Sequence, residues 1–331
     1  MTAKPCARRY RGTPRNLKFL ARKLQRGELV AVPSETVYGL AGNALDAMAC
    51  RKIFTAKGRP SRDPLIVHIH SLKQLEQVAV PNAAALQLAQ AFWPGPLTLI
   101  LPKRAIVPDA VTAGLPSVAV RMPSHPLLRK LLRICQIPLA APSANPFGYV
   151  SPTNADHVRD GLGLKIDYIL DGGAAKIGIE STIVDLRQPG HPVLLRPGAI
   201  TQTALQRVLK RRVFEKPAGS APNGPQLAPG LLLRHYSPKT PVRLHKKLTL
   251  SQVARETAAE AWLFIKKPGV NLPKNVFWLD EHGHLPSVAH RLFASLRKLD
   301  AAGFEQINVE LAPGRGLAQA INDRLRRAAA K

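Results

Sequence analysis

Residues 29–42 read LVAVPSETVYGLAG, a short apolar strand that runs into a turn and then into glycines. Thr36 follows the strand in this sharp turn, where backbone N–H groups and hydroxyls can hold a carboxylate. A second stretch, KGRPSRDPLIVH at 57–68, places Lys57 and Arg59 around a glycine next to a proline. Together the two stretches predict an α/β fold with an anion-binding loop beyond a strand end.

The composition is that of a folded, strongly basic protein. Of 331 residues, 45% are hydrophobic and 21% are charged, which is enough for one large core or for two domains. The formal net charge is +27, and such a surplus attracts polyanions over long distances. Residues 1–26 hold nine Lys or Arg residues and no acid. This run is interpreted either as a solvated basic arm and helix face or as an RNA-facing patch.

The cysteines and the apolar segments indicate a cytoplasmic protein. The three cysteines, Cys6, Cys50 and Cys135, cannot all pair and are too far apart in sequence for a metal knuckle, which suits a reducing compartment. No apolar stretch follows the basic N-terminus, and no apolar run approaches the roughly 18 residues of a membrane span. We therefore expect no membrane contact. We also expect no protein-bound zinc, because H-E-x-x-H and paired C-x-x-C motifs are absent from the sequence.

Strand-like and helix-like segments alternate over residues 13–212, which is typical of an α/β domain. Thr13 and Asp46 are expected to cap helices, and a further helix is expected to begin at Pro152. Several neighbouring strand-like segments have no helix between them, so the sheet is expected to be twisted and mixed. Residues 1–12 lack packing periodicity and are expected to form a basic N-terminal arm.

The second part of the chain differs in composition. Residues 213–241 contain six prolines and three glycines and are interpreted as an interdomain linker. Beyond it, three strand-like segments and two long helix-like segments predict a smaller, Rossmann-like α/β domain over residues 242–331.

Standard nucleotide-binding and hydrolase motifs are missing. Gly173 and Gly178 have the spacing of a phosphate loop, but Ile179 stands where the lysine is required. There is no G-x-S-x-G elbow, so an ordinary serine hydrolase is not expected.

Small polar and basic residues instead lie in or beyond several strands. Arg121 ends VAVR, Ser143 follows PLAA, Ser181 opens STIVDL, and His68 lies within LIVHIH. A single histidine in a strand is usually a core residue, and a single serine there is usually a turn residue. The set as a whole predicts a cleft for an anionic ligand, because ligands of open α/β sheets bind beyond strand ends.

These stretches resemble the motifs of a known family. In chain order, PSETVYGL, KGRPSRDPLIVH, FWPGPLTLIL, VAVRMPSHP, PLAAPSANPFG, GIESTIVD and LRPG are similar to those of the threonylcarbamoyl-AMP synthases. RHYSP at 234–238 and AINDRLRRAA at 320–329 resemble the longer, two-domain branch of that family. The resemblance spans roughly residues 14–328, and long motifs in one order are more specific than any single short pattern.

The resemblance implies a reaction in which L-threonine, bicarbonate and ATP give threonylcarbamoyl-AMP and pyrophosphate. The product feeds the threonylcarbamoyl modification of the adenosine beside the anticodon in tRNA. The resemblance also implies a catalytic domain with a concave positive cleft, and Mg²⁺ carried by ATP rather than by the protein. Either tRNA or the transferase complex that consumes the product is an expected partner. The mechanism expected is mainly positioning and electrostatic stabilisation, with no evident general base for the threonine amine.

The family's binding residues are carried over by motif. The threonine pocket is expected to contain Thr36, His68, Arg121, Ala141 and Ser181, with Arg121 as the carboxylate clamp. The ATP site is expected to contain Lys57, Arg59, Asp63, Ser117, Ser143, Ser151, Arg196 and Tyr236. Two departures from the family pattern stand out. Ser34 replaces the usual first threonine of its motif but keeps a hydroxyl, and LLL at 231–233 replaces a lysine and an aromatic residue.

Two other functions remain open on the sequence alone. A non-catalytic double-stranded RNA or tRNA-binding module would explain the charge, although aromatic residues make up only 5% of the chain and no RNA-recognition motif is present. A carbamoyl-adenylate domain of hydrogenase maturation proteins would need extra zinc-finger and acylphosphatase segments, which this sequence lacks. For the linker, composition favours a disordered spacer, whereas the RHYSP motif favours a lid that folds over the nucleotide.

Overall fold

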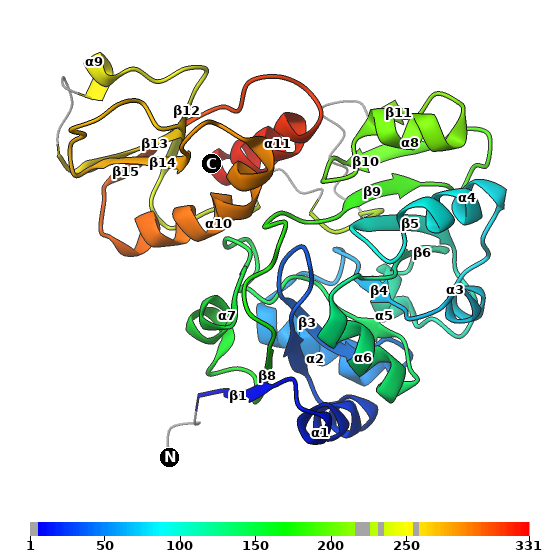
Figure 1. The fold of residues 1–331 in the computed structure, drawn as a ribbon. Helices are drawn as coiled ribbons and strands as arrows, with labels where there is room; N and C mark the ends of the chain where they lie inside the picture. Colours follow the sequence, from blue (N-terminus) through cyan, green and yellow to red (C-terminus); the bar gives the residue numbers. More distant parts are fainter. Residues whose placement is uncertain (1–5, 216–225, 231–234, 254–257, 331) are drawn as a thin grey trace.

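Two β-sheets organise the chain in the computed structural model, which describes residues 6–215, 226–230, 235–253 and 258–330 (Figure 1). The larger sheet has eleven strands. Across the sheet they are β1 (Arg8–Arg11), β8 (Tyr168–Asp171), β2 (Val30–Val32), β3 (Gly39–Asn43), β7 (Leu139–Ala140), β4 (Ile66–His68), β6 (Ser117–Arg121), β5 (Leu97–Pro102), β9 (Thr182–Asp185), β10 (Val193–Arg196) and β11 (Phe214–Glu215). Strand β6 is parallel to β4 and antiparallel to β5, so the expected mixed sheet is confirmed.

One face of the larger sheet is covered by helices, and together they enclose the main hydrophobic core. These helices are α2 (Ala47–Lys57), α3 (Leu72–Val78), α4 (Ala83–Phe92), α5 (Asp109–Thr112), α7 (Ala155–Leu162) and α8 (Gln202–Leu209). Ile53, Leu75 and Leu88 from three of them are fully buried against strand residues such as Val67 and Leu99. Each buried side chain of this kind contributes about 1.5–3 kcal/mol to folding.

The opposite face is covered by helices only in part. Helices α1 (Pro14–Gln25) and α6 (Pro126–Cys135) pack over β2, β3, β7 and β8. Farther along, Ile66, Ala119 and Ile183 of β4, β6 and β9 form a separate small cluster, to which no helix of the described residues contributes. Side chains alternate between the faces of a strand, so His68 and Arg121, two residues after Ile66 and Ala119, point to this same open face.

Helix starts follow their capping residues. Thr13 and Asp46 cap α1 and α2 as expected, because their side chains accept hydrogen bonds from backbone N–H groups of the first turn. Helix α7 begins at Ala155, three residues after the expected Pro152. The reason is that the side chain of Asn154 caps it, accepting from the backbone N–H of His157 at 2.8 Å.

The expected N-terminal arm is only partly an arm. Residues 8–11 form strand β1, which pairs in parallel with β8, and the Arg9 guanidinium contacts Asp156 and Asp171. Tyr10 stacks on Phe19 of α1, with ring centroids 5.4 Å apart. The expectation of an unpacked segment was wrong for these residues, since an exposed edge strand needs no apolar periodicity.

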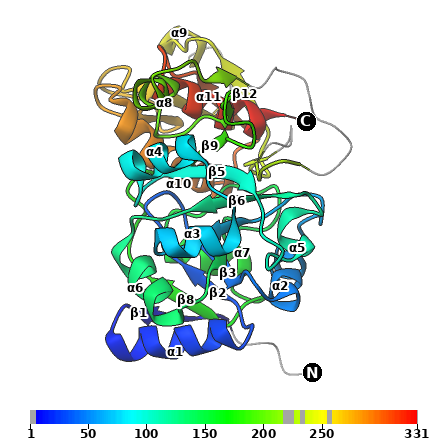
Figure 2. The same ribbon diagram turned by 90° about the vertical axis from the view of Figure 1, so that its right-hand side faces the viewer.

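The second sheet is four-stranded and parallel, with the order β12 (Val242–His245), β15 (Gln306–Glu310), β13 (Glu260–Lys266) and β14 (Val276–Asp280). Helices α10 (Leu285–Ala301) and α11 (Leu317–Ala329) pack on one face, and the short helix α9 (Leu250–Val253) packs on the other. Figures 1 and 2 show this domain at one end of the molecule, with α1 at the opposite end. Its main core also includes Val37, Val150, Ile179 and Tyr236, so it is continuous with the first part of the chain.

The described residues of the linker pack against both domains. Ala228 is fully buried against the open face of the larger sheet, and Gln226 donates its backbone N–H to the Arg62 carbonyl at 2.9 Å. Farther on, Ser237 donates its backbone N–H to the Gly148 carbonyl at 2.8 Å, and the Tyr236 ring stacks on Phe293 of α10 in the second domain. The LLL stretch at 231–233 and Arg234 lie outside the described residues.

Candidate functional site

A small cavity lies between the open face of the larger sheet, the linker and residues leading into β9. Its volume is about 50 Å³. It is lined by Val32, Ser34, Thr36, Val37, Gly39, Arg59, Ile66, His68, Arg121, Leu128, Ala141, Pro142, Ser143, Glu180, Ser181, Arg196, Pro229, Gly230, His235 and Tyr236. Nine of the thirteen binding residues expected from the sequence are therefore brought together here.

One end of the cavity is shaped by the turn after β2. The Ser34 hydroxyl accepts hydrogen bonds from the backbone N–H groups of Thr36 and Val37, each at 3.2 Å. Its oxygen lies 2.9 Å from the Thr36 hydroxyl. A serine is therefore sufficient where the family usually has threonine, because the turn uses only the hydroxyl.

The Arg121 guanidinium occupies the same end. It donates to the Thr36 hydroxyl at 2.9 Å, to the Gly95 carbonyl at 3.2 Å and to the Glu35 carboxylate at 2.6 Å. The Arg121 and Glu35 side chains are both buried. Burial, the largest single effect, raises the pKa of Glu35, but the charge and hydrogen bond of Arg121 together with backbone hydrogen bonds outweigh it and leave the pKa below its usual value.

His68 faces the cavity as a neutral imidazole. Burial, together with the charge of Arg121, lowers the pKa of His68 to about 3. Its Nδ1 lies 3.2 Å from the Ile66 carbonyl oxygen, which can only accept. Nδ1 therefore carries the proton, and Nε2 is left as an acceptor for a hydroxyl group in the cavity.

The other end of the cavity is dominated by Arg196. Its guanidinium donates to the Ser181 carbonyl at 3.1 Å, to the Ser181 hydroxyl at 3.2 Å and to the Pro229 carbonyl at 3.1 Å. The last bond joins β10 to the linker. At Gly230, whose φ is +75°, an added Cβ would lie 2.7 Å from the Tyr236 hydroxyl oxygen and 2.9 Å from the Arg196 guanidinium. Only glycine fits between them.

Arg59 and Tyr236 complete this end. Arg59 donates to the carbonyls of Asp63 and Pro64 at 2.9 and 2.8 Å and lies 2.9 Å from the buried Asp63 carboxylate. Tyr236 is 1% exposed, and its hydroxyl has no partner among the described residues. Burial raises the pKa of Tyr236 to about 12, so the hydroxyl stays protonated and can donate to a ligand.

Four residues expected at the ATP site do not line the cavity: Lys57, Asp63, Ser117 and Ser151. Lys57 Nζ donates to the carbonyls of Ser143 and Asn145 at 2.6 and 2.5 Å, so it supports the loop that carries Ser143. The Ser151 hydroxyl donates to Glu180 at 2.5 Å. Ser117 begins β6, at the end opposite to Arg121, and its buried hydroxyl has no partner among the described residues.

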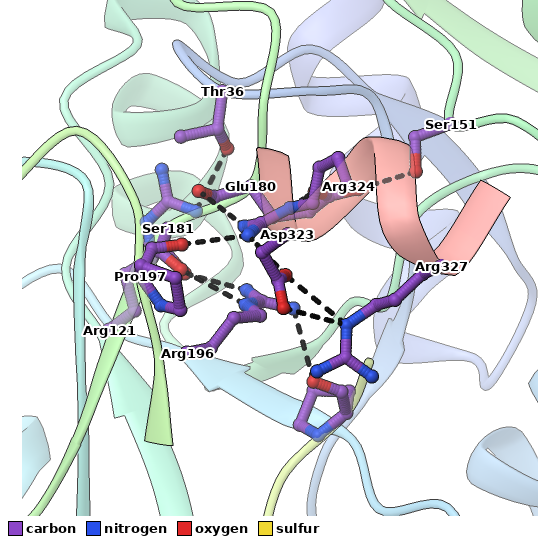
Figure 3. A network of polar contacts seen from close by, with 11 residues as sticks. Thr36, Arg121, Ser151, Glu180, Ser181, Arg196, Pro197, Asp323, Arg324 and Arg327 are labelled. Carbon is purple, nitrogen blue, oxygen red and sulfur yellow. Dashed lines mark hydrogen bonds and ion pairs between the residues drawn. The ribbon is translucent and has the colours of Figure 1, made fainter. Parts of the chain in front are cut away.

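A buried ion pair between the two domains was not expected from the sequence. Arg324 of α11 donates to the Glu180 carboxylate at 2.9 Å and to the Pro197 carbonyl at 2.7 Å (Figure 3). Its side chain is fully buried, and its guanidinium lies 5.7 Å from the centre of the Tyr236 ring. The available signal was its position on the apolar face of α11, four residues after Ala320 and four before Ala328.

No group of three or more His, Cys, Asp or Glu side chains among the described residues is arranged to hold a metal ion. The carboxylates nearest the cavity, Glu35, Asp63 and Glu180, are each paired with an arginine. In the described part of the chain, no helix is long and apolar enough to cross a membrane.

Comparison with known proteins identifies the family. Residues 22–198 match a family model described as "Telomere recombination", and residues 200–330 match the "Threonylcarbamoyl-AMP synthase, C-terminal domain" model. The threonylcarbamoyl-AMP synthase of Pyrococcus abyssi is 41% identical over 321 residues, covering 94% of this chain and 93% of that protein. The chain belongs to the threonylcarbamoyl-AMP synthase family.

Further relatives agree with this membership. The threonylcarbamoyl-AMP synthase of Bacillus subtilis is 41% identical over 318 residues, covering 92% of this chain and 90% of that protein. The crystal structure of P. abyssi Sua5 complexed with L-threonine matches with a TM-score of 0.87 and 39% identity, covering 98% of this chain and 97% of that chain. These two relatives thus match this chain across both of its domains, in the same order.

Proposed function

We propose that this chain condenses L-threonine, bicarbonate and ATP into threonylcarbamoyl-AMP and pyrophosphate. The observation that carries the proposal is the single cavity that unites nine motif residues from separate strands and loops. Family membership and the likeness to a threonine-bound relative support it.

The end that contains Thr36, His68 and Arg121 is proposed to bind threonine. A guanidinium supplies paired, charged hydrogen bonds for the carboxylate, and the neutral His68 Nε2 accepts a hydrogen bond from the threonine hydroxyl. An enzyme that pairs a buried acceptor with the substrate hydroxyl discriminates strongly against analogues that lack the hydroxyl.

The end that contains Arg59, Ser143, Arg196 and Tyr236 is proposed to bind ATP. The two buried arginines would hold phosphate oxygens and offset charge that develops on the α-phosphorus and the leaving pyrophosphate. Magnesium is proposed to arrive with ATP, where it would supply further charge neutralisation.

The linker is proposed to act as a lid. A volume of about 50 Å³ is far below the ~300–1,000 Å³ typical of small-molecule sites, so we infer that the cavity widens to admit threonine and ATP. Four residues of the linker line the cavity and would form the part that moves: Pro229, Gly230, His235 and Tyr236. Closure would keep water from the labile adenylate.

Two measurements test the lid. Protease cleavage within 213–241 should become slower when ATP and threonine are both present, and Tyr236→Phe should lower product formation while the chain stays folded. An unchanged cleavage rate together with full activity of the variant would show that the linker is a tether only.

We also propose that the face formed by α1 and α6 contacts RNA. Arg15, Lys18 and Arg22 of α1 and Lys130 and Arg133 of α6 are exposed, and neither helix contains an acid. Successive cations along α1 are separated by about 4.5–6 Å of helix axis, so one face of the helix presents several cations to a run of phosphates. Burial and the nearby charge of Arg133 lower the pKa values of His70 and Arg129, so cations are crowded here.

This second proposal is tested by binding to a tRNA transcript at several salt concentrations. A variant with Lys18→Glu, Arg22→Glu and Arg133→Glu should bind more weakly and with a smaller salt dependence. The matched control reverses three exposed lysines of the second domain, Lys246, Lys247 and Lys298. Equal losses in both variants would indicate net charge alone and would contradict a dedicated face.

A further inference from the structure

The residue directly before Thr36 is a buried glutamate that contacts Arg121. Glu35 is 5% exposed, and its Oε1 lies 2.6 Å from Arg121. Its Oε2 has no hydrogen-bond partner among the described residues. Arg121 is among the residues that line the cavity, whereas Glu35 is not among them. A buried ion pair of this kind contributes little net stability, so we consider a role in setting geometry.

The backbone around Glu35 is fixed from two sides. On one side, the Ser34 hydroxyl ties down the following turn through the N–H groups of Thr36 and Val37. On the other side, Ile177 donates its backbone N–H to the Glu35 carbonyl at 2.8 Å, and Gly178 donates to the Thr36 carbonyl at 3.1 Å. The Glu35 carboxylate is thus attached to a rigid support.

Glu35 and its neighbours determine which way the Arg121 guanidinium faces. A guanidinium has five N–H donors. Nε is bonded to the Gly95 carbonyl, one terminal nitrogen to Thr36 and the other to Glu35. With one hydrogen used in each bond, one N–H remains on each terminal nitrogen, and two such donors are what a carboxylate needs for bidentate contact.

We propose that Glu35 is a positioning residue that presents the two remaining N–H donors of Arg121 to the threonine carboxylate. This inference rests on the proposed function and assigns Glu35 a part in the specificity of the cavity end that is proposed to bind threonine. Glu35 acts through Arg121 and does not itself contact the substrate.

The proposal is testable because loss of charge neutralisation and loss of positioning would change the KM for threonine in opposite directions. If Glu35 merely neutralised Arg121, removing the negative charge would leave a buried cation free to attract the substrate carboxylate, and the KM for threonine would fall. If Glu35 positions Arg121, its removal lets the guanidinium turn, and the KM for threonine rises.

The experiment measures pyrophosphate release by Glu35→Ala and Glu35→Gln, with L-threonine or with L-threoninol, which lacks the carboxylate. We expect Glu35→Ala to raise the KM for threonine by about tenfold or more. Glu35→Gln should give a smaller rise, because a neutral oxygen accepts a weaker hydrogen bond than a carboxylate. In both variants the KM for ATP should stay within roughly twofold of the original, and the preference for threonine over threoninol should fall. A general structural defect would lower activity with both substrates equally and would leave that preference intact.

The control is Glu76→Gln, which removes the charge of an exposed glutamate on α3. A KM for threonine at or below the original value in Glu35→Gln, or an unchanged preference over threoninol in either variant, would overturn the proposal. The isosteric Glu35→Gln carries the test if Glu35→Ala does not fold. Failure of the proposed function is recognised separately, because the unsubstituted chain would then release no threonine-dependent pyrophosphate.

Discussion

Arg324 near the end of the chain and Glu180 of the GIESTIVD motif form a buried ion pair with a distance of 2.9 Å, although 144 residues separate them in sequence. Glu180 also accepts a hydrogen bond from Ser151 at 2.5 Å, and the next residue, Ser181, is bonded to Arg196. Figure 3 shows that α11 brings Arg324 into the same polar network as Arg121, Arg196 and Ser181. The second domain therefore supports the wall of the cavity directly.

The first prediction concerns this contact. Arg324→Ala leaves Glu180 unpaired in a buried position, which typically costs about 3–5 kcal/mol. We expect docking of the second domain to weaken, with a large loss of pyrophosphate release and earlier thermal unfolding. Arg326→Ala, on the exposed side of the same helix, is the matched control and should behave like the original chain. Equal activity of the two variants would show that the interdomain pair is dispensable.

The second prediction concerns the carboxylate clamp. Arg121→Ala should raise the KM for threonine strongly, because losing a buried, charged partner costs about 2–5 kcal/mol. ATP binding, which depends on the other end of the cavity, should survive. Steady-state kinetics at varied threonine and calorimetric titration with ATP separate the two effects. An unchanged threonine requirement would remove Arg121 from the clamp role.

The third prediction is a pH dependence of stability caused by His68. Its pKa is about 3 in the folded chain and about 6.5 when exposed, so the unfolded chain binds one more proton between these values. The stabilising contribution is therefore present above about pH 6.5 and is lost as the pH falls toward 3. In His68→Gln, the slope of the unfolding free energy against pH should be smaller by about 1.4 kcal/mol per pH unit between pH 4 and 6.

Urea unfolding at several pH values measures this slope. His282→Gln, which removes an exposed histidine, is the control and should follow the original chain. Parallel curves for His68→Gln and the original chain would mean that His68 is not held neutral by burial.

The fourth prediction concerns strand β1. A chain that starts at Thr13 should still make the adenylate, because residues 8–11 lie at the sheet edge and do not line the cavity. It should unfold at a lower temperature, since the pairing of β1 with β8 is lost. The ion pairs of Arg9 are partly exposed and add little. A folded but inactive truncated chain would place the N-terminal segment in the active machinery.

Local sequence patterns predicted much of the fold. The caps at Thr13 and Asp46 and the run of strands without helices between them correctly indicated the helix starts and the mixed sheet. Strand β1 was missed because its exposed arginines show no alternation of polar and apolar residues. The strand-end pattern placed Arg121 and His68 at one cleft, and the motif resemblance added Arg196, which also lines the cavity.

The remaining parts of the site depend on long-range packing. A lysine at the end of a helix is easily interpreted as a phosphate ligand. The direction of the Lys57 side chain is instead set by the carbonyls of Ser143 and Asn145, which are more than 80 residues away in sequence. The partnership of Glu180 with Arg324 requires the docking of two domains. Neither contact is encoded in a local spacing.

The proposed reaction is tested most directly by measuring pyrophosphate release from ATP by the full chain, with threonine and bicarbonate added singly and together, and by identifying the nucleotide product by mass. Release is expected only when both are present, with threonylcarbamoyl-AMP as the product and with release abolished or strongly reduced in Arg196→Ala. Release that is independent of threonine or bicarbonate, or no release together with tight binding to RNA, would contradict it.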